Sequence, residues 1–284
     1  MRSGSAGVSP ALPPSPASVG LWHLGEQKKR PDVIVVADAD ALARAAADRL
    51  LARLRRSNDR LAVCLTGGST PERLYQLLAT EPYRDAVSWN HIYWFWGDER
   101  FVAHNDPRSN FGMARRLLLD RVPIPSGHIC PIPTWAENVE EAARLYEAEL
   151  HRLYGAERLL PGRPLFDVVL LGLGPDGHTA SLFPSHAELG EKTRWVVGVP
   201  QAGCEPFVPR VTLTFPTLAS TREMLFLVSG PSKREIVSQV LAGSDLPAAH
   251  AYADGELLWL VDRDAAPERS DVAPTVPSAA GGRG

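Results

Sequence analysis

Short apolar runs alternate along the middle of the chain with longer stretches whose apolar residues recur every three or four positions. The short runs predict strands and the periodic stretches predict amphipathic helices. Strands are predicted at 33–36, 61–65, 92–96, 167–173, 195–199, 211–214, 224–228 and 257–261, and helices at 39–57, 71–78, 107–119, 137–153 and 233–241. Strands that alternate with helices are typical of βαβ units, so the pattern predicts an α/β fold with a mainly parallel sheet.

Both ends of the chain lack this pattern. Residues 1–31 and 267–284 are rich in Pro, Ser, Gly and Ala, which cannot build a core, and are predicted to be disordered tails. Residues 32–266 contain no linker-like stretch and are predicted to form a single domain. The N-terminus has no apolar core typical of a signal peptide, and no run approaches a membrane span. A cytoplasmic location without membrane association is therefore expected.

Composition and charge narrow the class of protein. Apolar residues make up 44% and charged residues 22% of the 284 residues, as in ordinary globular domains. The formal charge is −3, whereas a general nucleic-acid binder normally carries a basic excess. The three cysteines, Cys64, Cys130 and Cys204, are scattered, fit a reducing compartment and form no CxxC metal pattern. No bound nucleic acid and no metal are expected, and no protein partner can be identified.

A glycine-rich cluster follows the predicted strand 61–65. Gly67 and Gly68 allow a tight turn, and the helix that follows offers free N–H groups that suit a phosphate. Ser69 and Thr70 add hydroxyl donors. The segment is neither a Walker A motif nor GxGxxG, so it does not imply a nucleotide, and an ordinary capped turn is the alternative.

Two further polar clusters follow predicted strands. Asp98 and Arg100 lie after strand 92–96, where the arginine can bind a phosphate or an oxyanion and the aspartate can orient a histidine or a sugar hydroxyl. His178 follows strand 167–173 in a glycine-rich turn, where a helix is expected to begin. A histidine there suits proton transfer near neutral pH. Arg210 and Lys233 are further candidate phosphate ligands, although each alone is an ordinary surface charge.

These motifs together resemble the 6-phosphogluconolactonase family. The segments are LTGGSTPERLYQLL, WFWGDERFVAHNDPRSNFGMARRLLL, FDVVLLGLGPDGHTASLFP, RVTLTFP and WLVD, which cover about residues 32–266. The resemblance implies a Rossmann-like α/β fold with helices on both faces of the sheet. It also implies hydrolysis of 6-phospho-D-glucono-1,5-lactone to 6-phospho-D-gluconate, the second step of the oxidative pentose phosphate pathway, without a cofactor.

The resemblance also assigns roles to residues. His178 matches the family's general base, and Asp98 and Arg100 match residues that line the lactone. The loop of Gly67, Gly68, Ser69 and Thr70 matches the segment near the phosphate, and Arg210 and Lys233 match its cations.

Three alternatives remain open. Glucosamine-6-phosphate deaminases share the glycine loop and the DGH motif but continue with a glutamate five residues after the histidine, where this chain has Phe183. A non-catalytic sugar-phosphate sensor is expected to show a damaged base or phosphate loop, and neither is seen. A covalent route through Ser181 lacks the GxSxG motif of a nucleophile elbow.

Overall fold

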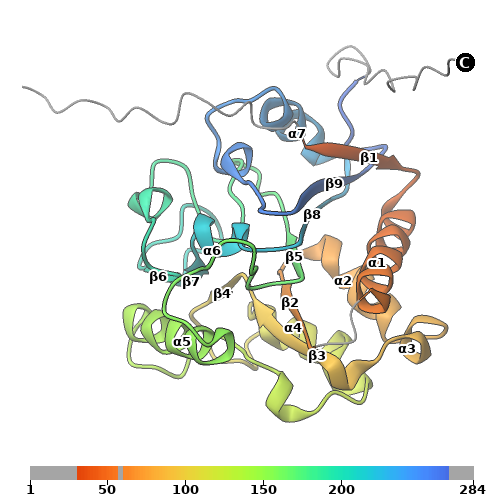
Figure 1. Cartoon of the computed structure of the whole chain (residues 1–284). Helices are drawn as coiled ribbons and strands as arrows, with labels where there is room; N and C mark the ends of the chain where they lie inside the picture. Colours follow the sequence, from red (N-terminus) through yellow and green to blue (C-terminus); the bar gives the residue numbers. More distant parts are fainter. Residues whose placement is uncertain (1–30, 57–59, 269–284) are drawn as a thin grey trace, which may run out of the picture. The chain divides into compact units, whose positions relative to one another are not determined.

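A parallel sheet of six strands forms the centre of the protein in a computed structural model that describes residues 31–56 and 60–268 (Figure 1). The strand order is β1-β9-β8-β5-β2-β3. These strands are β1 (Asp32–Val36), β2 (Leu61–Leu65), β3 (Ile92–Trp96), β5 (Val168–Leu171), β8 (Glu223–Val228) and β9 (Glu256–Asp262). All five neighbouring pairs run parallel, which confirms the predicted mainly parallel sheet.

A smaller antiparallel sheet continues from the end of β3. Its order is β4-β7-β6, with β4 (Asp98–Arg100), β6 (Val196–Val199) and β7 (Arg210–Leu213). Only Gly97 separates β3 from β4, so the chain passes directly from one sheet to the other. The sequence did not predict β4, because a three-residue charged segment carries no strand pattern of its own.

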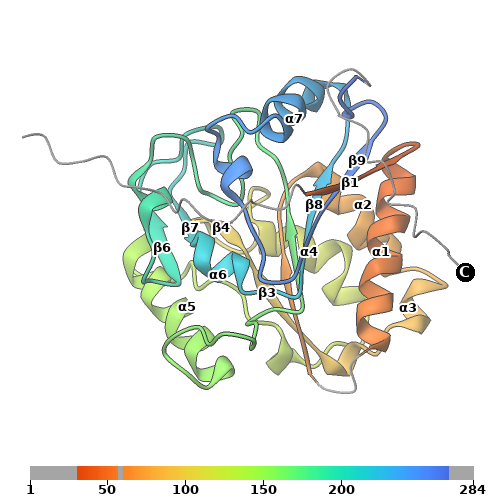
Figure 2. The same ribbon diagram turned by 45° about the horizontal axis from the view of Figure 1, so that its top comes forward.

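Seven α-helices connect and cover the strands. They are α1 (Ala39–Arg55), α2 (Ser69–Leu78), α3 (Tyr83–Ala86), α4 (Asn110–Leu117), α5 (Val139–Tyr154), α6 (Phe215–Ala219) and α7 (Arg234–Leu241), counted within the described residues. Helix α1 contacts β1, β8 and β9, whereas α5 contacts β6 and β7. Figure 2 shows α1 and α3 on one side of the six strands and α5 and α6 on the other, as expected for helices on both faces.

Side-chain caps explain where three of these helices begin. Asp38 accepts the N–H of Ala41 at 2.7 Å at the start of α1. Ser109 and Asn138 cap α4 and α5 in the same way. Such a cap satisfies one of the free N–H groups of the first turn and stabilises a helix by about 1 kcal/mol. The predicted helices at 107–119 and 137–153 are therefore confirmed, with their first turns starting two to three residues later.

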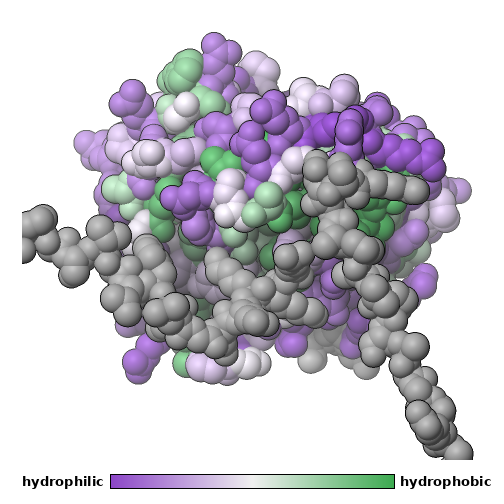
Figure 3. All heavy atoms as spheres, turned by 90° about the horizontal axis from the view of Figure 1, so that it is seen from above, coloured by the Kyte–Doolittle hydropathy of each residue, from purple (hydrophilic) through white to green (hydrophobic). Residues whose placement is uncertain are grey.

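The large aromatic residues lie in the core. Trp94, Trp96 and Trp259 are among the fully buried side chains, and the ring of Trp259 stacks on Phe226 at 4.1 Å between centroids. On the face seen in Figure 3 the surface is mostly hydrophilic, with smaller hydrophobic areas between the polar ones. The sheet thus brings its apolar residues inward and leaves polar loops at its ends.

One local prediction is wrong and one lies mostly beyond the described residues. No helix begins at His178, because residues 172–186 form turns and isolated bridges. The expected domain 32–266 lies within a compact unit that starts at Pro31. The predicted tails 1–31 and 267–284 fall almost wholly outside the described residues and stay predictions.

Candidate active site

A cavity of about 290 Å³ opens at the carboxyl ends of the central strands. In parallel α/β sheets this edge is where ligands bind. Loops that follow β2, β5 and β6 converge there, together with β4 and the starts of α4 and β7. The lining residues are Thr66, Gly67, Gly68, Asp98, Arg100, Asn110, Gly172, Leu173, Gly174, Pro175, His178, Ala180, Cys204, Glu205 and Arg210. The three polar clusters of the sequence therefore meet in one cavity.

The imidazole of His178 is held by the carboxylate of Asp176, a residue that the sequence did not predict as part of the site. Asp176 Oδ1 lies 2.5 Å from His178 Nδ1, and the same oxygen accepts the backbone N–H of His178 at 3.2 Å. Burial alone would raise the pKa of Asp176, but its hydrogen bonds with His178 outweigh burial and lower the pKa. An ionised carboxylate at Nδ1 keeps the proton there and leaves the Nε2 lone pair free to act as a base.

Glycine backbone shapes the turn around this histidine. A Cβ added to Gly174 would lie only 2.0 Å from His178 Nδ1, so the ring packs directly against the backbone. Gly177 has a φ of +80°, a left-handed conformation that favours glycine. The signal for Asp176 was present in the PDGH segment, but its role depends on this turn bringing it back onto the ring.

Asp98 does not orient His178. It is buried, and its Oδ2 accepts the hydroxyl of Ser181 at 2.6 Å. The side-chain amide of Asn110 donates to the backbone oxygen of Asp98 at 3.0 Å and to its Oδ1 at 3.4 Å. Of the two roles that the sequence left open for Asp98, the structure is compatible with contact to substrate, because Asp176 already occupies His178 Nδ1.

Two guanidinium groups face the cavity from neighbouring strands. Arg100 and Arg210 are directly paired in the β4–β7 register. Arg100 Nη1 donates to the carbonyl of Arg108 at 2.7 Å, while its buried Nε has no hydrogen-bond partner among the described residues. Burial lowers the pKa of Arg210, the nearby Asp98 opposes this shift and Arg100 adds to it. Arg210 donates from Nε to the carbonyl of Val208 at 3.2 Å and from Nη2 to that of Pro206 at 2.8 Å, which holds it at the cavity wall. Two cations close together at one cavity suit an anionic ligand.

The glycine loop lines the same cavity with its backbone. A Cβ on Gly67 would come within 1.9 Å of Asn110 Oδ1, and Gly68 has a φ of +104°. A side chain at Gly67 would therefore displace Asn110, whereas one at Gly68 would have space but a strained backbone. Ser69 and Thr70, expected to donate hydroxyls, are the first residues of α2 and are not among the lining residues.

Lys233 also lies outside the lining. Its Nζ donates to the carbonyl of Leu173 at 2.6 Å, which ties the turn before α7 to the loop after β5. Burial lowers the pKa of Lys233, while the negative charge of Asp176 opposes that shift. The ammonium group therefore approaches the cavity from behind Leu173, and the structure does not place it at the cavity wall.

Two tyrosine hydroxyls fix the strand ends that carry the site. Tyr75 from α2 accepts the N–H of Thr66 at 3.1 Å and donates to its carbonyl at 2.7 Å. Tyr146 from α5 makes the same pair of bonds with Trp96, at 2.9 and 3.2 Å. Burial raises the pKa of both tyrosines, so the hydroxyls remain protonated. These contacts hold the loops after β2 and β3 against their helices.

Cys204, for which the sequence predicted no role in the site, also lines the cavity. Its Sγ lies 3.9 Å from His178 Nδ1. Burial raises the pKa of this thiol, with Asp176 adding to the shift, so the neutral form is favoured near neutral pH.

Within residues 31–56 and 60–268, no group of three or more His, Cys, Asp or Glu side chains is placed to hold a metal ion. None of the helices in that part of the chain is long and apolar enough to cross a membrane.

The chain is similar to known proteins over most of its length. A protein named 6-phosphogluconolactonase from Synechocystis is 41% identical over 208 residues, which are 72% of this chain and 82% of that protein. One of the same name from Nostoc is 39% identical over 246 residues, covering 84% and 98%. The crystal structure of 6-phosphogluconolactonase from Thermotoga maritima matches with a TM-score of 0.71 at 30% identity, covering 82% of this chain and all of that one. Residues 37–259 match the model of the glucosamine-6-phosphate isomerases/6-phosphogluconolactonase family, and the chain belongs to that family.

Proposed function

We propose that this protein is an enzyme that hydrolyses 6-phospho-D-glucono-1,5-lactone to 6-phospho-D-gluconate, with His178 as general base. The observation that carries the proposal is the His178–Asp176 pair in one cavity with Arg100 and Arg210. The names of the relatives at 39–41% identity support the same substrate. The reaction is the second step of the oxidative pentose phosphate pathway.

His178 supplies the proton transfers. With Nδ1–H donated to Asp176, Nε2 takes a proton from water as the water oxygen forms a bond to lactone C1. The C1–ring oxygen bond then breaks, and the imidazolium returns the proton to the departing oxygen. General acid–base catalysis of this kind typically contributes about 10²–10⁴-fold to the rate.

The arginines and the glycine loop bind the charged parts of the substrate. Arg100, which lines the cavity together with His178, stabilises the oxyanion that develops on the carbonyl oxygen. Arg210 and the backbone at Gly67 and Gly68 hold the phosphate, and this remote binding orients the lactone. Lys233 adds positive charge from behind Leu173, and Ser69 and Thr70 assist only if the loop adjusts.

Contacts in the site weigh against each alternative. Phe183, at the position of the deaminases' glutamate, is buried and packs against His178 with 4.7 Å between ring centroids, where it can transfer no proton. Ser181 is buried, donates to Asp98 and is not among the residues that line the cavity, so its hydroxyl is not presented to a lactone. A sensor would not need the His178–Asp176 pair. The three free cysteines support a reducing, cytoplasmic location.

The test is a lactonase assay of His178→Ala that subtracts spontaneous hydrolysis. We expect kcat to fall by about 10²–10⁴-fold because the proton acceptor is lost. His250→Ala is the matched control, since His250 is an exposed histidine that also pairs with an aspartate. Near-normal turnover by a folded His178→Ala protein would contradict the assignment, and a wild-type protein that binds the lactone without hydrolysing it would indicate a sensor.

A further inference from the structure

A second and larger cavity, of about 510 Å³, lies at the opposite edge of the sheet from the candidate active site. Its lining includes Leu61 and Ala62, the first residues of β2, and Tyr93 near the start of β3. The active-site cavity is lined by residues that follow these strands. The two cavities are therefore separated by the length of the parallel strands.

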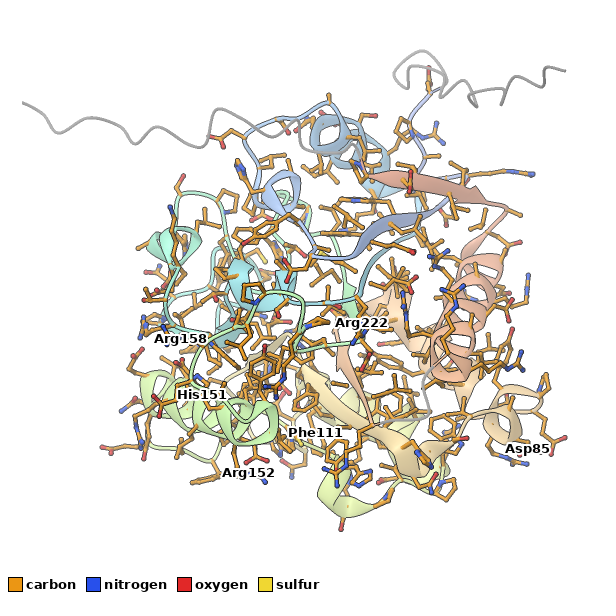
Figure 4. The ribbon with its side chains drawn as sticks, in the orientation of Figure 1. Asp85, Phe111, His151, Arg152, Arg158 and Arg222 are labelled. Carbon is orange, nitrogen blue, oxygen red and sulfur yellow. The ribbon has the colours of Figure 1, made fainter. Side chains whose placement is uncertain are left out.

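Five arginines from separate segments line this second cavity: Arg53, Arg56, Arg60, Arg163 and Arg222. They come from the end of α1, the approach to β2, the segment after α5 and the residue before β8. Arg222 is labelled near the centre of Figure 4. Asp167 is the only acidic residue among the lining residues that the structure describes. The wall is thus strongly basic, although the whole chain has a formal charge of −3.

Only part of this positive charge is balanced inside the described structure. Arg53 pairs with Glu223 at 3.0 Å and Arg222 with Asp167 at 3.1 Å. Asp167 also accepts the N–H of Ala62 at 2.9 Å. Arg56, Arg60 and Arg163 form no ion pair with any carboxylate of residues 31–56 and 60–268. Like charges gathered in a concave wall attract a counter-anion.

Two of these arginines are held in place by aromatic rings. The guanidinium carbon of Arg163 lies 4.3 Å from the centroid of Tyr154, and that of Arg60 lies 5.3 Å from the centroid of Tyr93. Contact with a ring face orients a guanidinium through the attraction of its charge to the ring and occupies none of its N–H donors. Nη2 of Arg163 also donates to the carbonyl of Tyr154, which fixes this side chain further. These two groups can therefore present N–H donors to a ligand at lower cost in side-chain entropy.

We propose that this cavity binds a small organic anion with at least two phosphate groups. A guanidinium offers a planar fork that matches phosphate oxygens, and several forks suit more than one phosphate. The volume falls within the range of about 300–1,000 Å³ common for small-molecule sites. A concave cavity with arginines from four segments fits a compact ligand better than an extended nucleic acid or peptide. The site is independent of the lactonase reaction.

The test is calorimetric titration of the full chain with inorganic pyrophosphate at low salt. We expect pyrophosphate to bind the wild type, and Arg56→Gln/Arg60→Gln to weaken this binding by about tenfold or more, since charge-assisted hydrogen bonds are lost. Arg115→Gln/Arg152→Gln removes the same charge at exposed positions outside the cavity and is the matched control. Its affinity should equal that of the wild type.

A second pair of variants separates this cavity from the active site. Arg60→Gln/Arg163→Gln should lose pyrophosphate binding and keep the wild-type lactonase rate, whereas Arg210→Gln should keep this binding. Absence of pyrophosphate binding to the wild type would overturn the proposal. So would equal binding by Arg56→Gln/Arg60→Gln and its control, or binding that disappears in Arg210→Gln.

Discussion

The carboxylate of Asp176 determines what His178 can do. An imidazole that is free to rotate or to change tautomer is a base only part of the time, while one that donates Nδ1–H to a fixed carboxylate always presents Nε2. The 2.5 Å contact also places a negative charge where an imidazolium would form during the reaction. One short segment, Asp176-Gly177-His178, therefore holds both the base and the group that orients it.

Asp176→Asn should separate orientation from binding. The amide can donate to Nδ1, which moves the ring proton to Nε2 and removes the base, so kcat should fall by about 10²–10⁴-fold with little change in KM. Asp245→Asn is the matched control, because Asp245 pairs with the exposed His250 at 2.6 Å outside the cavity. A wild-type kcat for Asp176→Asn would show that His178 needs no partner.

At the scale of elements, Glu99 joins β4 to the start of α4. Its carboxylate accepts the N–H groups of Arg100, Asn110 and Phe111, each at 2.7 Å, and the hydroxyl of Ser109 at 3.0 Å. This one side chain thus fixes the strand of Asp98 and Arg100 against the helix that supplies Asn110. Burial raises the pKa of Glu99 to about 7, although all four hydrogen bonds act to lower it.

This shift predicts a pH dependence of stability. A carboxyl whose pKa is higher in the folded state than its model value of 4.5 binds more protons when folded. The contribution of Glu99 to the free energy of unfolding is fully present below pH 4.5 and is lost as the pH rises through about 7. We expect denaturant unfolding of the wild type to show a loss of about 1–3 kcal/mol between pH 5 and pH 8 that Glu99→Gln does not show. If the free energies of unfolding of the wild type and Glu99→Gln changed in the same way with pH, this prediction would be contradicted.

The sequence could predict those elements whose own residues carry the pattern, and not those that depend on contacts with distant parts of the chain. The helix 233–241 was predicted because its apolar residues recur at helical spacing, and the strand 224–228 because it is a short apolar run. The meeting of the polar loops followed from the parallel strand ends. The strand β4 was missed because its partner β7 lies over a hundred positions further on. The helix expected at His178 was wrong because the Gly-rich turn closes on Asp176 instead.

At the scale of the whole molecule, an ion cluster joins the first helix to the last strands. Glu223 of β8 accepts hydrogen bonds from Arg49 and Arg53 of α1, and Arg49 also binds Glu256 of β9 at 3.0 Å. The Glu223 side chain is 4% exposed and that of Glu256 61%. The same arginine therefore has one buried and one solvated partner.

This contrast gives a matched pair of variants. Glu223→Ala should lower the free energy of unfolding by about 3 kcal/mol, because it leaves two arginines without their buried partner. Glu256→Ala should lower it by about 0.5 kcal/mol or less, since water screens an exposed pair. Denaturant titrations of the three proteins measure both changes, and equal losses would show that burial is not the deciding factor.

The position of β9 between β1 and β8 has a consequence for how the protein is made. Every residue that lines the active-site cavity lies before position 211, whereas the strand that pairs with β1, β9, comprises residues 256–262. While the ribosome is still adding the last part of this domain, the first strand has no neighbour to pair with. The nascent chain therefore contains every residue that lines the active-site cavity before the last strand of the sheet has been synthesised.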